Sequence, residues 1–438
     1  MKKYRSIVYT LGILATMTGT VVHADGFPAN QYITGDWGGE RAKLADEGVT
    51  FKLGYFSQGA KNTSGGKRHT TAYADQFFLG GYFDLYKLID WRGAELKVEI
   101  TDRNGTLINN EAGMPFLLQS QQIYGRGNIT RLTQFSLTQK LFDDHLSVKV
   151  GRIYPSADFF AMSCAFQNLT FCSGGSSNFI NSSWYSNPVS ALGAQVTFTP
   201  DKHWYFKAGG YNNNKDALST SNGLRLWPSG GWTGTMLVGE VEYKADYGNG
   251  IDGDYRVGVV RNDSSASKIY DEAGFPAGLT TTPVASVSES HAFYVNLEIQ
   301  VYRTASGGGL RMFASMIHPD KRISQVGEVL AIGGFITGPF ASRPHDRIGL
   351  ALGRNAVSSK LTAAQRLYNQ LRPVGASAVG VQRYEYVVEL NYNIALAPGI
   401  EVMPSIEVMP SIQYVRHPDG LANVANATVL GAQLSLNF

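Results

Sequence analysis

Four charged side chains recur at odd-numbered positions along one short segment of the chain. Glu95, Lys97, Glu99 and Arg103 alternate with mainly apolar residues over positions 94–103. A period of two places all four on one face of a β-strand, and that face needs water or partners because unpaired charges in a dry interior are very costly. Glu99 and Arg103 would then offer an acceptor and a two-pronged donor to the hydroxyl groups of a polar solute. Alternatively, the opposite charges neutralise each other and only hydrate the wall of a lumen.

A second group of candidate residues lies in a long loop expected over positions 156–188. The loop holds Asp158, Trp184 and several phenylalanines. Aromatic rings offer flat apolar faces on which a ring-shaped solute can stack, and a carboxylate accepts hydrogen bonds from hydroxyl groups. The alternative stays open that the aromatic side chains pack the loop against the rest of the protein or lie in a membrane interface.

Short alternating runs separated by Gly, Asn, Asp and Pro follow one another from about residue 48 to the end. They predict about sixteen strands, with fourteen or eighteen as alternatives, and no linker divides them. The 49 glycines, the many Phe and Tyr residues and the low charged fraction of 17% suit a large barrel with aromatic girdles and a polar lumen. We therefore expect an all-β, antiparallel transmembrane β-barrel over 48–438, preceded by a short helix at 38–47.

The first residues have the features of a signal peptide. Lys2, Lys3 and Arg5 precede the charge-free stretch 7–22, and a small-residue cleavage site follows. We expect residues 1–24 to be removed, with 25–47 as the N-terminal segment of the mature protein. Removal leaves 35 basic and 35 acidic residues, and this balance argues against a nucleic-acid-binding protein.

The remaining chemical signals point away from catalysis. In an exported protein, Cys164 and Cys172 are expected to form a disulfide, although two unpaired cysteines are the alternative. Two thiols do not make a metal site, and the sequence carries no GxSxG, HExxH, P-loop or GxGxxG motif. We expect no enzyme activity, no metal and no cofactor. A barrel enzyme or a plugged structural barrel is the alternative of another class.

The last ten residues alternate in the same way and finish on an aromatic side chain, Phe438. A terminal aromatic on an alternating strand resembles the recognition signal of bacterial outer-membrane barrels, which implies the barrel-assembly machinery and outer-membrane lipid as partners. In a lipid bilayer, only helices and closed barrels satisfy all their backbone hydrogen bonds. The end of the chain therefore points to the bacterial outer membrane.

Several segments together resemble the carbohydrate-selective porins of the OprB family. The fairly specific one is TGDWGGERAKLADEGV at 34–49, which is similar to the opening motif of that family. Weaker similarities follow in the family's order at 88–94, 141–152, 338–346 and 413–420. Neither the pair of cysteines nor the hexapeptide duplicated over 401–412 is expected from the family pattern.

This resemblance implies a sixteen-stranded outer-membrane barrel through which monosaccharides and other small carbohydrates diffuse passively. A sugar channel needs donors, acceptors and aromatic surfaces with binding weak enough for release, which makes Glu95, Lys97, Glu99, Arg103, Asp158 and Trp184 the candidate sugar contacts. A general or anion-preferring porin is the alternative within the same class. The sequence leaves the particular sugar and the oligomeric state open.

Overall fold

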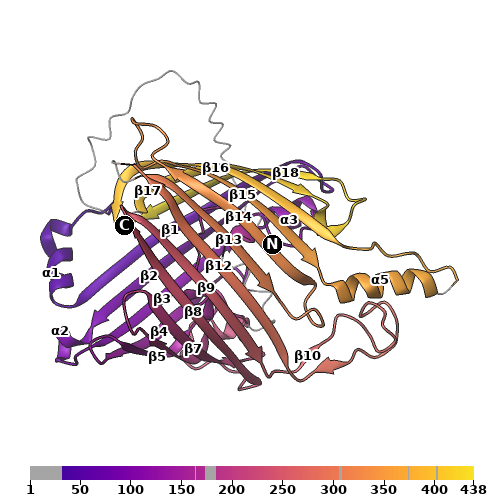
Figure 1. Ribbon diagram of the computed structural model, residues 1–438, viewed down its shortest axis with the longest axis horizontal. Helices are drawn as coiled ribbons and strands as arrows, with labels where there is room; N and C mark the ends of the chain where they lie inside the picture. The colour runs from indigo at the N-terminus through magenta and orange to yellow at the C-terminus, as the bar shows by residue number, and fades with distance from the viewer. Residues whose placement is uncertain (1–31, 163, 173–183, 305–307, 373, 401–402) are drawn as a thin grey trace, which may run out of the picture.

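The chain forms a closed antiparallel barrel of sixteen strands in the part that the structure describes (Figure 1). The computed structural model describes residues 32–162, 164–172, 184–304, 308–372, 374–400 and 403–438. The predicted fold class, strand number and short N-terminal helix are therefore confirmed. The predicted signal peptide, residues 1–24, lies outside the described residues and stays a prediction.

Each barrel strand pairs with its neighbours along the chain, and the last strand pairs with the first. The barrel strands are β1 (Val49–Ser64), β2 (Thr71–Asp84), β3 (Ala94–Gly105), β4 (Ile129–Leu141), β5 (Leu146–Ile153), β6 (Ala191–Phe198), β7 (Trp204–Asn213), β8 (Gly234–Gly248), β9 (Ile251–Asn262), β12 (Ser290–Arg303), β13 (Gly309–His318), β14 (Val326–Thr337), β15 (Arg347–Val357), β16 (Tyr384–Ile400), β17 (Met403–Arg416) and β18 (Ala427–Asn437). A separate two-stranded sheet joins β10 (Ala266–Ser267) to β11 (Ser286–Val287).

The period of two in the sequence determines which side chains face out of the barrel. In β2, Phe77 and Leu79 are exposed on the outer surface, whereas Gln76 and Phe78 point inward with the other even-numbered residues. Apolar residues outside and polar residues inside are what a barrel needs in lipid around an aqueous lumen. The barrel closes where β1 pairs with β18, and the amide of Phe438 donates to the carbonyl of Leu53 at 2.9 Å.

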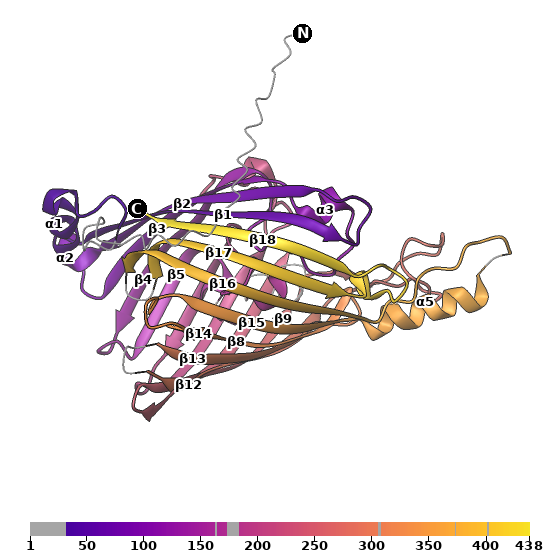
Figure 2. The same cartoon turned by 90° about the horizontal axis from the view of Figure 1, so that it is seen from above.

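Short turns join the strands at one end of the barrel and longer loops join them at the other. The turns at 142–145 and 249–250 belong to the short end, which also carries α1 (Glu40–Asp46) and α2 (Leu85–Ile89). At the opposite end, α5 (Ser359–Leu371) projects from the loop between β15 and β16 (Figure 2). In outer-membrane barrels the short turns are periplasmic and the long loops extracellular.

None of the helices in the described ranges is long and apolar enough to cross a membrane. Of the duplicated hexapeptide, residues 401–402 lie outside the described ranges. The second copy, 407–412, forms part of β17 and keeps the alternation, with Glu407 facing the lumen and Ile412 facing outward. An even-numbered duplication therefore leaves the two faces of the strand unchanged.

Candidate functional site

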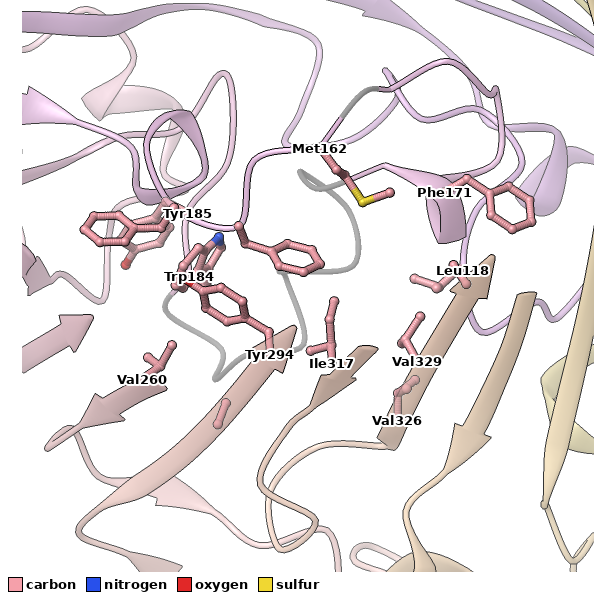
Figure 3. Close-up of a cluster of buried hydrophobic side chains, with 14 of the residues drawn as sticks. Leu118, Met162, Phe171, Trp184, Tyr185, Val260, Tyr294, Ile317, Val326 and Val329 are labelled. Atoms are coloured by element: carbon pink, nitrogen blue, oxygen red, sulfur yellow. The ribbon is translucent and has the colours of Figure 1, made fainter. Parts of the chain in front are cut away.

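Two of the long loops fold back into the barrel. They are the loop 106–128 between β3 and β4, with α3 (Ile108–Ala112), and the loop between β5 and β6, of which residues 154–162, 164–172 and 184–190 are described. Side chains of these loops pack against inward-facing side chains of β9 to β14, as Figure 3 shows for Trp184 beside Tyr294 and for Leu118 beside Val329. The apolar core of this protein therefore lies inside the barrel and fixes the two loops there.

Three buried carboxylates of the barrel wall anchor these loops by accepting backbone N–H bonds. Glu240 of β8 accepts from the amide of Phe160 at 2.7 Å, and it also accepts from the Tyr294 hydroxyl at 2.7 Å. Glu385 of β16 accepts from the amide of Leu117 at 2.9 Å. Glu389 accepts from two consecutive amides of the longer loop, as described next. Bonds of this charge-assisted kind are about twice as strong as neutral ones.

Gln167 and Asn168 bind the wall on both sides of the line where the barrel closes. Their amides donate to the two oxygens of Glu389, each at 2.7 Å. The Gln167 side chain donates to the Gly59 carbonyl of β1 at 3.2 Å and accepts from the Ser411 hydroxyl of β17 at 2.7 Å. It lies over Gly431 of β18, where a Cβ atom would overlap its oxygen. One side chain thus touches the strands that flank the closure.

Between the inward loops and strands β1 to β3 lies a cavity of about 590 Å³. A volume of this order is that of a small-molecule site. The polar and aromatic groups of its lining that matter below are Phe56, Gln76, Phe78, Arg103, Arg126, Tyr154 and Asn187. The cavity therefore combines hydrogen-bonding groups with apolar ring surfaces in one narrow part of the lumen.

Arg103 is held rigidly at the wall of this cavity. Its Nε donates to Gln76 Oε1 at 2.7 Å, and its Nη2 donates to Asn187 Oδ1 at 3.1 Å. A third, longer bond of 3.4 Å runs to the carbonyl of Gly125. Strand β2 and both inward loops therefore fix the orientation of one guanidinium group, which is the preorganisation that selective binding requires.

Further arginines continue from the cavity into the protein. Arg126 lines the cavity, and burial lowers the pKa of its guanidinium group. Behind it, Arg131 is 1% exposed and donates to the carbonyls of Arg126 and Leu218. Arg152 is equally buried and donates to the Ser190 hydroxyl at 2.9 Å, as well as to carbonyls of the loop between β7 and β8. These arginines hold the loops together and make this part of the lumen positive.

The charged strand that opened the sequence analysis is only partly at the cavity. Arg103 lines it, and Glu99 lies next to it, because Asn187 bonds Arg103 through its oxygen and Glu99 through its nitrogen. Lys97 pairs with Glu99 at 3.2 Å. Glu95 is exposed near the short-turn end of β3. The alternation was read correctly, but the four residues do not form one site.

Asp158 and Trp184 are buried in the packing of the longer loop. Asp158 forms an ion pair with Lys149 of β5 at 2.6 Å. Trp184 is 1% exposed and packs edge-on against Tyr294, with ring centroids 6.2 Å apart. Its faces are covered, so in this structure the ring is placed as a packing residue. This is the alternative that the sequence left open for the aromatic residues of the loop.

Several cavity residues were missed from the sequence. Phe56 and Phe78 belong to the even-numbered, inward faces of β1 and β2. The signal for them was present, because a large aromatic residue on the otherwise polar face of a strand points into the lumen. Arg126 and Asn187 come from loops distant in sequence and carried no such signal.

Three further candidate residues make contacts within the protein. Cys164 and Cys172 are joined by a disulfide bond, and both line the cavity. Phe438 stacks on Phe77 of β2, with ring centroids 6.3 Å apart. The disulfide therefore restrains the loop that narrows the lumen. The side chain of Phe438, which follows β18, lies on the outer surface of the barrel against β2, on the other side of the line where β18 pairs with β1.

Comparison with known proteins decides the family. Residues 68–438 match the family described as "Carbohydrate-selective porin, OprB family". The chain belongs to this family. Porin B of Pseudomonas aeruginosa is 35% identical over 455 residues, covering 100% of this chain and 99% of the relative. The putative porin QuiX of Acinetobacter baylyi is 31% identical over 93% of both chains.

Solved structures agree with this assignment. The high-pH structure of Pseudomonas putida OprB has a TM-score of 0.86 and 33% identity, covering 93% of this chain and 99% of that one. The low-pH structure of Pseudomonas putida OprB has a TM-score of 0.59 and 25% identity, covering 94% and 100%. As a carbohydrate-selective porin of the OprB family, the protein is an outer-membrane channel.

Proposed function

We propose that the protein lets monosaccharides such as glucose diffuse passively across the outer membrane, and that the cavity beside Arg103 is where they bind. The observation that carries this proposal is the composition of the cavity wall, in which a fixed guanidinium group, the amides of Gln76 and Asn187, and two phenylalanine rings face the same space. Sugars present hydroxyl groups at their edges and apolar C–H groups on their faces. The two kinds of surface in the cavity match the two kinds on a sugar.

The test is single-channel conductance of the purified protein in a planar bilayer, titrated with glucose and with a non-sugar solute of equal size. We expect saturable block by glucose alone. Arg103→Ala should weaken that block at least tenfold, because it removes the guanidinium group that Gln76, Gly125 and Asn187 hold in the cavity wall. Arg311→Ala is the matched control: Arg311 is another lumen-facing arginine, ion-paired to Asp252 at 2.5 Å, and it does not line the cavity. Unblocked conductance in the unsubstituted protein would indicate a general porin.

The finer expectations about the chain belong to the same proposal. Residues 1–24 serve as a signal peptide, 25–47 form the N-terminal segment, and 48–438 form the barrel. Phe438 serves as the signal for the barrel-assembly machinery, and the outward aromatic and aliphatic side chains contact outer-membrane lipid. The protein has no catalytic activity, so ester and lipid hydrolysis by the purified barrel should be undetectable.

An anion-preferring channel is the second candidate, and one observation favours it. Arg131 and Arg152 add positive charge next to the cavity, and their described hydrogen bonds go to neutral acceptors. The reversal potential in a salt gradient separates the two candidates. A strong preference for chloride over potassium together with no block by glucose would favour the second.

A further inference from the structure

On the wall opposite the cavity, lysine and arginine side chains are paired with carboxylates of the protein itself. On the opposite wall, Lys207 pairs with Glu240 and Glu242, and Arg256 pairs with Glu242. Arg311 pairs with Asp252 in the same way. The wall of β7 to β13 therefore combines cations with carboxylates of the protein itself, and a charged solute there would have to compete with them.

Three guanidinium groups, one in the cavity wall and two behind it, lack such carboxylates. Arg103, Arg131 and Arg152 occur in none of the ion pairs formed within the described ranges. Their bonds go to one glutamine, one asparagine, one serine and several backbone carbonyls. Neutral acceptors orient a guanidinium group without cancelling its charge, so the positive potential extends into the cavity.

Glu99, which bonds the cavity-lining Asn187, does not cancel this potential. Asn187 joins one oxygen of Glu99 to the cluster, and the other oxygen pairs with Lys97 at 3.2 Å. Asp102, the next acid along β3, lies on the opposite face of the strand and accepts from the Thr130 hydroxyl. The charges of Lys97 and Glu99 offset each other, so Glu99 leaves the charge of Arg103 uncompensated.

We propose that the preferred solutes of this cavity are sugar acids, that is, polyhydroxylated carboxylate anions such as gluconate and glucuronate. This inference rests on the proposed function and names a narrower substrate class for the same site. The carboxylate pairs with the guanidinium groups of Arg103 and Arg126, for which planar two-oxygen anions are the best geometric match. The hydroxyl groups bond the amides of Gln76 and Asn187, and the C–H faces lie against Phe78.

The experiment measures block of the single-channel current of the full-length protein by four solutes: gluconate, sorbitol, glucose and acetate. Gluconate and sorbitol share a six-carbon polyol chain and differ in charge, whereas acetate has the charge without the hydroxyl groups. We expect the dissociation constant for gluconate to be at least tenfold lower than for the other three. Raising the salt concentration should weaken the block by gluconate and leave that by glucose unchanged.

Substitutions at the two cavity arginines separate charge from hydrogen bonding. Arg103→Gln and Arg126→Gln each remove a positive charge, while the amide group of the new glutamine can still donate hydrogen bonds. Each substitution should therefore raise the dissociation constant for gluconate at least tenfold and that for glucose less than threefold. Arg103→Lys keeps the positive charge, so this variant should retain most of the preference for gluconate over glucose. Arg311→Gln, which removes a lumen charge outside the cavity, should leave all four dissociation constants unchanged.

Each result has a distinct meaning. Block by glucose with no preference for gluconate overturns the assignment of sugar acids and leaves the sugar channel standing. Equal block by acetate and gluconate overturns it in favour of a site for anions in general. No block by any of the four solutes refutes the proposed function, and the present inference with it.

Discussion

Glu389 offers the sharpest test of how the lumen is narrowed. Its carboxylate is fully buried, and each of its oxygens accepts one backbone N–H of the inward loop at 2.7 Å, from Gln167 and Asn168. Glu389→Gln keeps the volume and one accepting oxygen. The other oxygen becomes an NH2 group that faces an N–H donor, so one of the two bonds must be lost.

The size of the effect follows from the geometry. A hydrogen bond to a charged group contributes about 1.5–3 kcal/mol, and the amide left without an acceptor is buried. The remaining bond also weakens because its acceptor is now neutral. We expect a loss of about 3 kcal/mol in the free energy of local opening, and since about 1.4 kcal/mol corresponds to tenfold, the opening constant of this segment should rise about 100-fold.

Hydrogen–deuterium exchange of peptides that contain Gln167 and Asn168 measures this opening. The matched control is Glu407→Gln on β17, because Glu407 also faces the lumen but bonds Arg347 of β15 at 3.1 Å. Exchange in the same peptides should not change in that variant. A rise of less than about fivefold for Glu389→Gln, with the barrel still folded, would show that the carboxylate does not anchor the loop.

Two further substitutions test a loop and the packing inside the barrel. Burial raises the pKa of Asp419 from 3.8 to about 6, so its turn should lose stability as the pH rises between these values, because only the folded state still holds the proton. Asp419→Asn should remove this pH dependence of the protection factor of the Gly420 amide, that is, of its exchange rate relative to an unstructured peptide at the same pH. A constant protection factor from pH 4 to 7 before substitution would contradict the reasoning. Gly258→Ala would overlap the buried Tyr294 ring and should cost about 1–3 kcal/mol in urea unfolding. Gly239→Ala, whose Cβ would be 3.8 Å from its nearest neighbour, should unfold like the parent, and equal unfolding of both variants would refute the packing argument.

Much of the barrel could be predicted from the sequence because its rule is local. A strand that borders lipid on one face and water on the other must alternate, and this identified β3 and the inward position of Arg103 from a few residues. The helix expected at 38–47 contains α1. Each of these features depends on neighbours in the chain.

The cavity could be predicted only in part because it depends on contacts across the lumen. Asn187 meets Arg103 from a position 84 residues away, and nothing near either residue encodes that encounter. The role of Trp184 also could not be predicted from its neighbours in the chain. An aromatic residue in an inward loop can face solute or pack on the wall, and the choice was made by Tyr294, which lies 110 positions further along the chain.

The place where Gln167 binds has a consequence for the order in which the channel is built. The carbonyl of Gly59, the small residue Gly431 and the hydroxyl of Ser411 come from both ends of the chain. This docking place exists only after the last strand has paired with the first. The narrow passage is therefore completed last, and a barrel whose closing strands separate loses its wall and its selectivity in the same event.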